Sequence, residues 1–426
     1  MPSDVERPTQ GFAYSLRAFR HREFSLFWTG AVISNIGSWL SNLTVPFVIY
    51  QDTHSAFWVG LVSVFQFAPN ILLGPWGGVL ADRHDRRRVL LVTQTGLALA
   101  ALLLWGAWVA GVRAPLVIMT MVGVAGMFQG VNLPSWQAFV NDLVPREDLT
   151  SAVALNSLQF NAARALGPAI AGILLALAGP GWALLLNAVS FGAVLLALLA
   201  MRNPGLSQRL VDPLPVRRQF VNALHYIRSQ PGIQVSIASA LLVGLLVNPI
   251  FQFTVVFSES VFKVGPVALG MLNAALGLGA LLAVPLMSGW SHIISLPRLA
   301  KAGLFGQGLG LIAFAAAANP RWAAAALVLV GGAFLMTISA GNTAVHLIVA
   351  NRMRGRVIAI RVMIYTGSFP IAGVVQGALA DRFGPRATVA GAGAMLLVAA
   401  SVFSALRGRY SLSHMTDAHD EDAALS

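Results

Sequence analysis

Long apolar runs alternate with short polar segments along the whole chain. The apolar runs are about 20 residues long, which is the length that a helix needs to cross a bilayer. We place about twelve spans near residues 25–50, 56–81, 89–111, 115–139, 151–178, 181–201, 234–257, 266–289, 299–318, 322–349, 357–380 and 386–406. The runs lack the apolar–polar alternation of a membrane β-strand, so the pattern predicts helices.

The longest polar stretch inside the chain, residues 202–232, separates six spans from six. Within it Phe220, Leu224 and Ile227 share one helical face beside several arginines, which predicts a short helix lying on the membrane surface. We therefore expect an all-α membrane protein. Its expected parts are an N-terminal arm (1–24), a six-helix bundle (25–201), a linker (202–232), a second six-helix bundle (233–407) and a disordered tail (408–426).

Composition supports a membrane protein and excludes several classes of chemistry. The chain is 57% hydrophobic and only 10% charged, whereas a soluble protein carries about 25% charged residues. The formal net charge of +12 is best explained by arginines at the cytoplasmic membrane surface, not by nucleic-acid binding. Cysteine is absent, which excludes disulfides and thiolate metal sites. The first 24 residues lack the apolar core of a cleaved signal peptide.

The distribution of basic residues predicts the orientation in the membrane. With the N-terminus inside, 21 of the 28 Lys and Arg residues fall on cytoplasmic segments, five fall outside, and Arg164 and Arg361 lie within spans. This asymmetry follows the positive-inside rule. Both termini and the 202–232 linker should therefore be cytoplasmic, and we expect a multi-pass membrane protein.

The charge is concentrated in the stretch GGVLADRHDRRRVLL (77–91), between the second and third spans. The positive-inside rule accounts for the arginines in this stretch, but it accounts for neither the two aspartates nor the glycines. Gly74, Gly77 and Gly78 allow close helix approach, and Asp82 stands at a helix end where a carboxylate needs a partner.

This stretch resembles the loop 2–3 signature of the major facilitator superfamily, G-x-L-A-D-R-x-G-R-K/R. Gly78, Leu80, Ala81, Asp82, Arg83, Arg86 and Arg87 match it, and Asp85 replaces the usual glycine. FRHREFSLFWTGAVISNIGSWL, ARALGPAIAG and NRMRGRV look like the subgroup of bacterial exporters that includes enterobactin exporters and macrolide efflux pumps. The resemblance implies two pseudo-symmetric six-helix bundles that alternate access to a central cavity, and a place in a bacterial inner membrane.

We predict a conformational latch on the cytoplasmic side. Asp82 should contact the helix N-terminus of span eleven in the other bundle, as the resemblance implies, and Arg86 should pair with Asp142. The candidate latch residues are Gly78, Asp82, Arg83, Arg86 and Asp142. The related sequence GALADRFGPR (377–386) falls after span eleven, outside, and we expect it to be a chance match.

Polar residues inside spans are costly and usually face the bundle interior. They are candidates for the substrate cavity, although interhelical hydrogen bonding alone would also explain single amides. A buried guanidinium needs an acceptor, which makes Arg164 the strongest candidate. The set is Asn35, Trp39, Asn42, Gln66, Gln129, Asn132, Asn161, Arg164, Asn248, Gln252 and Asn342.

No carboxylate lies at the middle of a span, where proton-driven exporters often keep one. The arginine of the family's R-x-x-Q-G motif is also missing, because Gly126 stands at that position. Proton antiport, which the resemblance implies, therefore has only peripheral candidate carriers: Asp52, Glu259 and His346. A structural role for a lone histidine is the alternative.

We interpret the chain as a secondary active exporter of a small amphipathic or hydrophobic organic molecule, siderophore or drug-like. The expected partners are this substrate, protons and membrane lipid, and we expect a monomer without cofactor or metal. A same-fold importer, a lipid flippase and a non-transporting sensor remain alternatives. A membrane enzyme is disfavoured, because the spans hold no acid–base pair or metal constellation and the sequence has no nucleotide-binding P-loop.

Overall fold

The computed structural model describes residues 16–202, 216–290, 295–405 and 415. All regular elements in these ranges are helices. Eleven of these helices are long and apolar enough to cross a membrane, and the longest, α6 (Leu149–Ala200), contains two spans. The expected all-α membrane fold is therefore confirmed.

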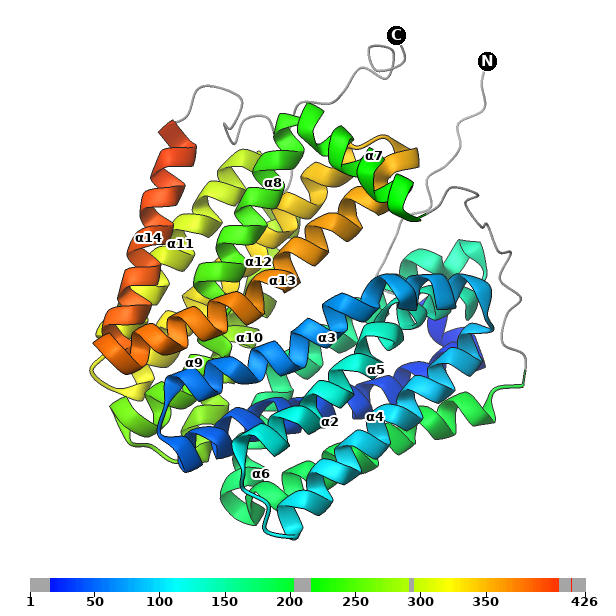
Figure 1. Ribbon diagram of the computed structural model, residues 1–426. Helices are drawn as coiled ribbons and strands as arrows, with labels where there is room; N and C mark the ends of the chain where they lie inside the picture. Colours follow the sequence, from blue (N-terminus) through cyan, green and yellow to red (C-terminus); the bar gives the residue numbers. More distant parts are fainter. Residues whose placement is uncertain (1–15, 203–215, 291–294, 406–414, 416–426) are drawn as a thin grey trace.

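The helices form two halves (Figure 1). The first half contains η1 (Arg17–Arg20), α2 (Arg22–Thr53), α3 (Ala56–Arg83), α4 (Arg86–Val109), α5 (Pro115–Asp142), η2 (Arg146–Asp148) and α6. The second contains α7 (Val216–Ser229), α8 (Pro231–Leu242), η3 (Val243–Val247), α9 (Ile250–Val256), η4 (Phe257–Phe262), α10 (Pro266–Trp290), α11 (Leu296–Ala316), α12 (Pro320–Ile348), α13 (Asn351–Phe383) and α14 (Pro385–Ala405). The expected arm and tail fall largely outside the described residues.

Local chemistry explains where the helices begin and turn. The side chain of Asp85 accepts a hydrogen bond from the Arg88 amide and starts α4, and Asn319 caps α12 in the same way. Spans five and six meet inside α6 at Gly179, whose φ of 79° is accessible to glycine at little cost. The helix expected in the linker is present as α7, which buries Ala223 and Ile227 against the second half.

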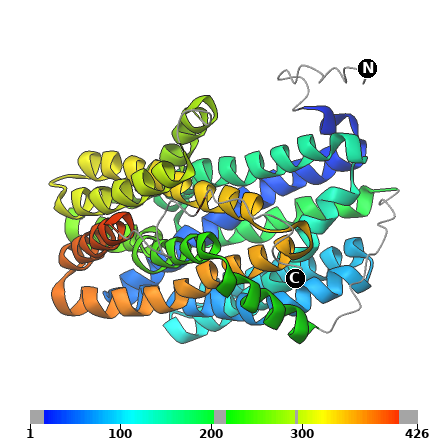
Figure 2. The same ribbon diagram turned by 90° about the horizontal axis from the view of Figure 1, so that it is seen from above.

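The two halves meet along two helix pairs, α3 with α13 and α6 with α10. The two helices of the α3–α13 pair run in opposite directions and diverge from one end of the molecule to the other (Figures 1 and 2). We call the end where α3 and α4 join at Arg83 the Arg83 end, and the opposite end the Asp381 end. A Cβ added to Gly60 would lie 2.0 Å from the Gly373 carbonyl oxygen, whereas Gly74 has nothing within 4 Å. The halves therefore touch near the Asp381 end and separate toward the Arg83 end.

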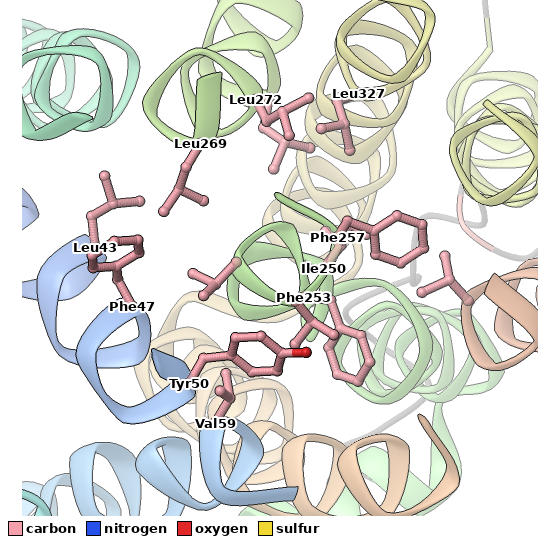
Figure 3. Packing of buried hydrophobic residues seen from close by; sticks show 14 of the residues in the cluster. Leu43, Phe47, Tyr50, Val59, Ile250, Phe253, Phe257, Leu269, Leu272 and Leu327 are labelled. Carbon is pink, nitrogen blue, oxygen red and sulfur yellow. The ribbon is translucent and has the colours of Figure 1, made fainter. Parts of the chain in front are cut away.

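The apolar cores follow the same division. One cluster spans both halves at the Asp381 end, where Phe47 and Tyr50 of α2 face Ile250 and Phe253 of α9 (Figure 3). At the Arg83 end, one cluster lies wholly in the first half and another wholly in the second. Burial of apolar side chains thus seals the Asp381 end and leaves the halves unjoined at the other.

Candidate functional site: a cavity between the two halves

A cavity of about 280 Å³ lies between the two halves, beneath the apolar seal. Both halves contribute side chains to it. The lining residues are Trp39, Asn42, Leu43, Ser63, Gln66, Phe67, Arg164, Asn248, Pro249, Phe251, Gln252, Asn273, Tyr365, Phe369 and Gly373. We call this the central cavity. A volume of this order suits a small organic ligand.

A second cavity of about 420 Å³ lies within the first half and shares Trp39, Asn42, Gln66 and Phe67 with the central one. We call it the side cavity. Asn35, Gln129 and Asn132 line it, together with Asn70, Gln94 and Phe160. The shared residues form the boundary between the two cavities, so a ligand longer than the central cavity has adjoining space on one side.

Most of the residues that the sequence suggested for a substrate cavity do line these two cavities. Trp39, Asn42, Gln66, Arg164, Asn248 and Gln252 line the central cavity, and Asn35, Gln129 and Asn132 line the side cavity. Asn161 and Asn342 line neither. The Asn161 amide donates to the Ser157 carbonyl of its own helix, and Asn342 accepts from Arg361.

Several of the lining amides already have protein partners. Gln66 donates to Asn42 over 3.0 Å, and Asn35 donates to Gln159 over 2.9 Å. Asn132 accepts from Thr93 and Gln94. These pairs connect neighbouring helices and fix the walls of the cavities.

Asn248 is different, because half of its amide is unsatisfied. Its Oδ1 accepts from the Tyr365 hydroxyl over 3.3 Å, but its buried Nδ2 has no hydrogen-bond partner among the described residues. The π-helical turn η3 directly precedes this residue, and Pro249 follows it. Such turns within a helix frequently mark functional sites.

The two arginines within the spans differ in the same respect. The buried Arg361 donates to Ser236 over 3.0 Å and to Asn342 over 2.5 Å, so its charge has acceptors. The Arg164 guanidinium reaches from α6 into the second half, 4.7 Å from the Phe251 ring centre and 4.8 Å from that of Phe334. No acceptor or acidic partner is found for it within the described part of the chain.

Sequence reasoning did not identify the aromatic wall of the central cavity. Phe67 and Phe369 are in edge contact with ring centres 5.0 Å apart, and Tyr365 and Phe369 are 4.9 Å apart. An aromatic residue in an apolar span looks the same in sequence whether it faces lipid, core or cavity. The one sequence signal for this part of the cavity was Asn248–Pro249, a helix-breaking pair inside a span.

The loop between α3 and α4 forms one of its two predicted latch contacts. Arg86 Nη1 donates to both carboxylate oxygens of Asp142, at 2.7 and 2.8 Å. Both residues belong to the first half, so the pair braces that half. Asp82 and Arg83 are exposed, and within the described ranges neither side chain has a hydrogen-bond or ion-pair partner. A Cβ on Gly78 would meet nothing within 4 Å.

The three candidate proton carriers lie away from both cavities. Asp52 is exposed at the end of α2, and His346 is exposed near the end of α12. Glu259 is partly buried at the Asp381 end, where the Gln51 side chain of the first half donates to it. Of the three, Glu259 alone has an identified contact across the two halves in the described structure.

At the Asp381 end, Asp381 joins the two halves directly. Its carboxylate accepts hydrogen bonds from Ser55 Oγ (2.5 Å), the Ala56 amide (2.6 Å) and the Phe57 amide (3.1 Å), which form the N-terminus of α3. Asp381 belongs to GALADRFGPR, the segment expected to be a chance match. This contact was not expected from the sequence.

Curated relatives of the chain are bacterial exporters and transporters. The chain is 28% identical to the enterobactin exporter of Salmonella typhi over 75% of this chain and 76% of the relative. It is 24% identical to macrolide efflux protein A of Streptococcus pyogenes over 68% of this chain and 72% of the relative. It is 30% identical to the staphyloferrin A transporter of Staphylococcus aureus, but that match spans only 40% of this chain and 44% of the relative.

Solved structures with the same fold are major facilitator transporters. A bacterial homolog of the human lysosomal transporter Spinster, in an inward-facing and occupied conformation, superposes with a TM-score of 0.73 at 16% identity over 94% of this chain and 97% of that one. A D-xylose–proton symporter superposes with a TM-score of 0.70 at 14% identity over 94% of this chain and 99% of that one. At these identities the likeness establishes the fold.

The family model described as "transmembrane secretion effector" matches residues 13–423, which is nearly the whole chain. Together with the two bundles and the cavity between them, this match shows that the chain belongs to the transmembrane secretion effector family of major facilitator transporters, a multi-pass membrane protein.

Proposed function

We propose that the protein exports a small amphipathic organic molecule, siderophore or drug-like, from the cytoplasm across a bacterial inner membrane. The observation that carries the proposal is the central cavity, where amide and aromatic side chains from both halves surround a space of about 280 Å³. Relatives named for enterobactin, macrolides and staphyloferrin A support this class of substrate.

Alternating access is the mechanism that the helix arrangement supports. The α3–α13 contact and the apolar seal close the Asp381 end, and the helices separate toward the Arg83 end. The positive-inside rule assigns the Arg83 end, which carries most of the basic residues, to the cytoplasm. In this state, an exporter would load substrate from the cytoplasm.

Asp381 and Asp82 form the basis of the proposed switch between states. The sequences GVLADR (78–83) and GALADR (377–382) end α3 and α13, two helices that run in opposite directions across the interface. Asp381 is bonded to the N-terminus of α3 while Asp82 is exposed. In the outward-open state, Asp82 would take the matching place at the N-terminus of α13, where a helix carries about half a positive charge.

Proton antiport is the coupling that we propose, with Glu259 as the first candidate carrier. Its contact with Gln51 lies across the two halves at the Asp381 end, so protonation there would weaken an interaction that must break when that end opens. Asp52 and His346, both exposed, are the next candidates.

The direct test is substrate flux in proteoliposomes with and without a pH gradient, combined with the drug and siderophore sensitivity of a strain with and without the gene. Export driven by an inward proton gradient supports the proposal. Uptake would identify an importer, movement of labelled phospholipid would identify a flippase, and the absence of flux with intact ligand binding would favour a sensor.

A further inference from the structure

The central cavity contains a cation without a counter-ion. Arg164 is the one charged residue among its lining residues, and the side cavity has none. In the described structure the guanidinium lies over the aromatic faces of Phe251 and Phe334, and it interacts electrostatically with the uncharged Tyr365 side chain. Arg164 is partly exposed to the cavity, and a guanidinium inside a span is costly without an acceptor, so its position there points to a ligand that supplies one.

A second free donor lies in the same cavity. Asn248 Nδ2 is buried and unsatisfied, while Tyr365 holds the oxygen of the same amide. The bond from Tyr365 leaves the NH₂ group as the unsatisfied part of the amide, in a residue that lines the cavity. The cavity therefore offers a guanidinium and an amide donor, both of which would be satisfied by an acceptor with several lone pairs, such as a carboxylate.

Arg361 shows what a guanidinium with a structural role looks like in this protein. Its hydrogen bonds go to Ser236 and Asn342 in its own half, and it does not line the central cavity. Arg164 crosses to the other half, and no acceptor for its donors is found among the described residues. We therefore assign a packing role to Arg361 and a binding role to Arg164.

The remaining lining residues describe the rest of the ligand. Trp39, Phe67, Phe251, Tyr365 and Phe369 present aromatic surface to the central cavity. Aromatic surface favours a planar or apolar body, and it attracts no anion, so the anionic group must be held by Arg164 and Asn248.

We infer that the substrate is an amphipathic organic anion, with a carboxylate or similar planar anionic group at Arg164 and Asn248 and an aromatic or apolar body against the aromatic wall. This inference rests on the proposed transport function and deepens it. It excludes cationic drugs as preferred substrates, because a cation would meet Arg164 with no acidic side chain in the cavity lining to offset the repulsion.

The test uses three fluorescent probes that share one aromatic body: dansylglycine (anionic), its amide (neutral) and dansylcadaverine (cationic). Purified protein in nanodiscs is titrated with each, and the fluorescence change gives the Kd. We expect dansylglycine to bind at least about 10-fold more tightly than the neutral amide. This ratio of Kd values corresponds to the net free energy of one charge-assisted hydrogen bond. Arg164→Gln should remove this preference by weakening the binding of dansylglycine much more than the binding of the neutral amide.

The control Arg113→Gln removes one positive charge from an exposed loop, where Arg113 stacks on Trp108, and it should keep the preference. Equal binding of the three probes by the wild type, or an unchanged preference in Arg164→Gln, would overturn the inference, including the case in which Arg164 holds only an inorganic anion. Flux of the neutral or cationic probe alone would leave export standing and refute the anionic class. Arg164-dependent binding without flux would support the anionic class and refute export.

Discussion

Most of the charged residues that the structure describes lie near the ends of helices or in the segments that join them, and two, Arg164 and Arg361, lie inside spans. A guanidinium inside a span is stable only with partners, because hydrocarbon supplies none. Arg361 satisfies this requirement within its own half. Arg164 meets it only in part, through the faces of two phenylalanine rings, which stabilise a cation but accept no conventional hydrogen bond.

Replacement of Arg164 should therefore affect transport more than folding. We expect Arg164→Ala to reduce export at least about 10-fold, because a charge-assisted contact to the substrate is lost. Arg164→Lys should not restore export, because an ammonium lacks the planar fork of a guanidinium. Vesicle flux measured alongside thermal stability tests this prediction. Full export by a stably inserted Arg164→Ala protein would remove the residue from the site.

The Arg86–Asp142 pair makes a separate prediction at the residue scale. The two side chains are only 17% and 10% exposed, so loss of one partner leaves a poorly solvated charge. Each single charge reversal should lower the free energy of unfolding by about 3 kcal/mol, the lower value for a buried pair. The double reversal should recover more stability and transport than either single variant. Additive losses in the double variant would contradict direct pairing.

At the scale of elements, glycines determine how closely α3 and α13 approach. A Cβ on Gly377 would lie 2.6 Å from the Ala56 carbonyl oxygen, and one on Gly60 would lie 2.0 Å from that of Gly373. Real Cβ atoms do not come this close to backbone, so any larger residue at these positions must push the helices apart.

We expect Gly60→Ala to lower stability by about 1–3 kcal/mol through overpacking and to weaken closure of the Asp381 end. Gly74→Ala is the matched control on the same helix, because nothing lies within 4 Å of its added methyl group. The control should be neutral or slightly stabilising, since alanine favours helix over glycine. Melting temperatures of the two purified variants measure this difference in stability. Equal melting temperatures would show that the α3–α13 contact is looser than described.

The sequence predicted the helices well, because spans are defined by local composition and length. The expected span 56–81 is observed as Ala56–Arg83, and 386–406 as Pro385–Ala405. The break between spans five and six was also visible, since Gly179–Pro180 interrupts an apolar run. The π-helical turns η3 and η4 were not predicted, because an extra residue in a helical turn leaves no mark in hydropathy.

The site was predicted less completely, because it depends on contacts between segments far apart in sequence. Polar residues such as Asn42 and Arg164 were identifiable because they are rare inside spans. Tyr365 and Phe369 were not, since nothing local separates a cavity wall from a lipid-facing surface. The contact of Asp381 with the start of α3 joins residues more than 300 positions apart, a pairing that only the fold reveals.

At the scale of the whole molecule, orientation is the first property to test. From the distribution of basic residues we propose that the Arg83 end, both termini and the linker are cytoplasmic. Gln208, in the linker but outside the described residues, offers a labelling position, and the chain has no native cysteine to interfere. Gln208→Cys should resist an impermeant thiol reagent added to intact cells and react after the cells are opened. Ready labelling of intact cells would reverse every side assignment made above.

In the proposed alternating access, the two GxLADR segments act at opposite ends of the molecule. Because α3 and α13 are antiparallel, the two segments lie at opposite ends of the interface: GALADR lies beside the first turn of α3, and GVLADR lies at the end where α13 begins. Asp381 is engaged where the halves touch, and Asp82 is exposed where they separate. If each aspartate stabilises closure of its own end, the removal of one charge must favour the state that the other aspartate closes.

Spin labels at Leu116→Cys and Trp322→Cys, exposed positions on opposite halves at the Asp381 end, report this equilibrium as a distance distribution. We expect Asp381→Asn to raise the ratio of the long-distance to the short-distance population about 5-fold, which is the effect of losing a favourable charge at a helix N-terminus. Asp82→Asn should lower the same ratio and impair transport, because it favours the state with the Asp381 end closed. Arg382→Gln, a charge change one residue away, should leave the distribution unchanged. Shifts in the same direction for both aspartate variants would mean that the two segments do not oppose each other. Normal transport by Asp82→Asn would mean that the arginine-rich loop serves only to fix the orientation in the membrane.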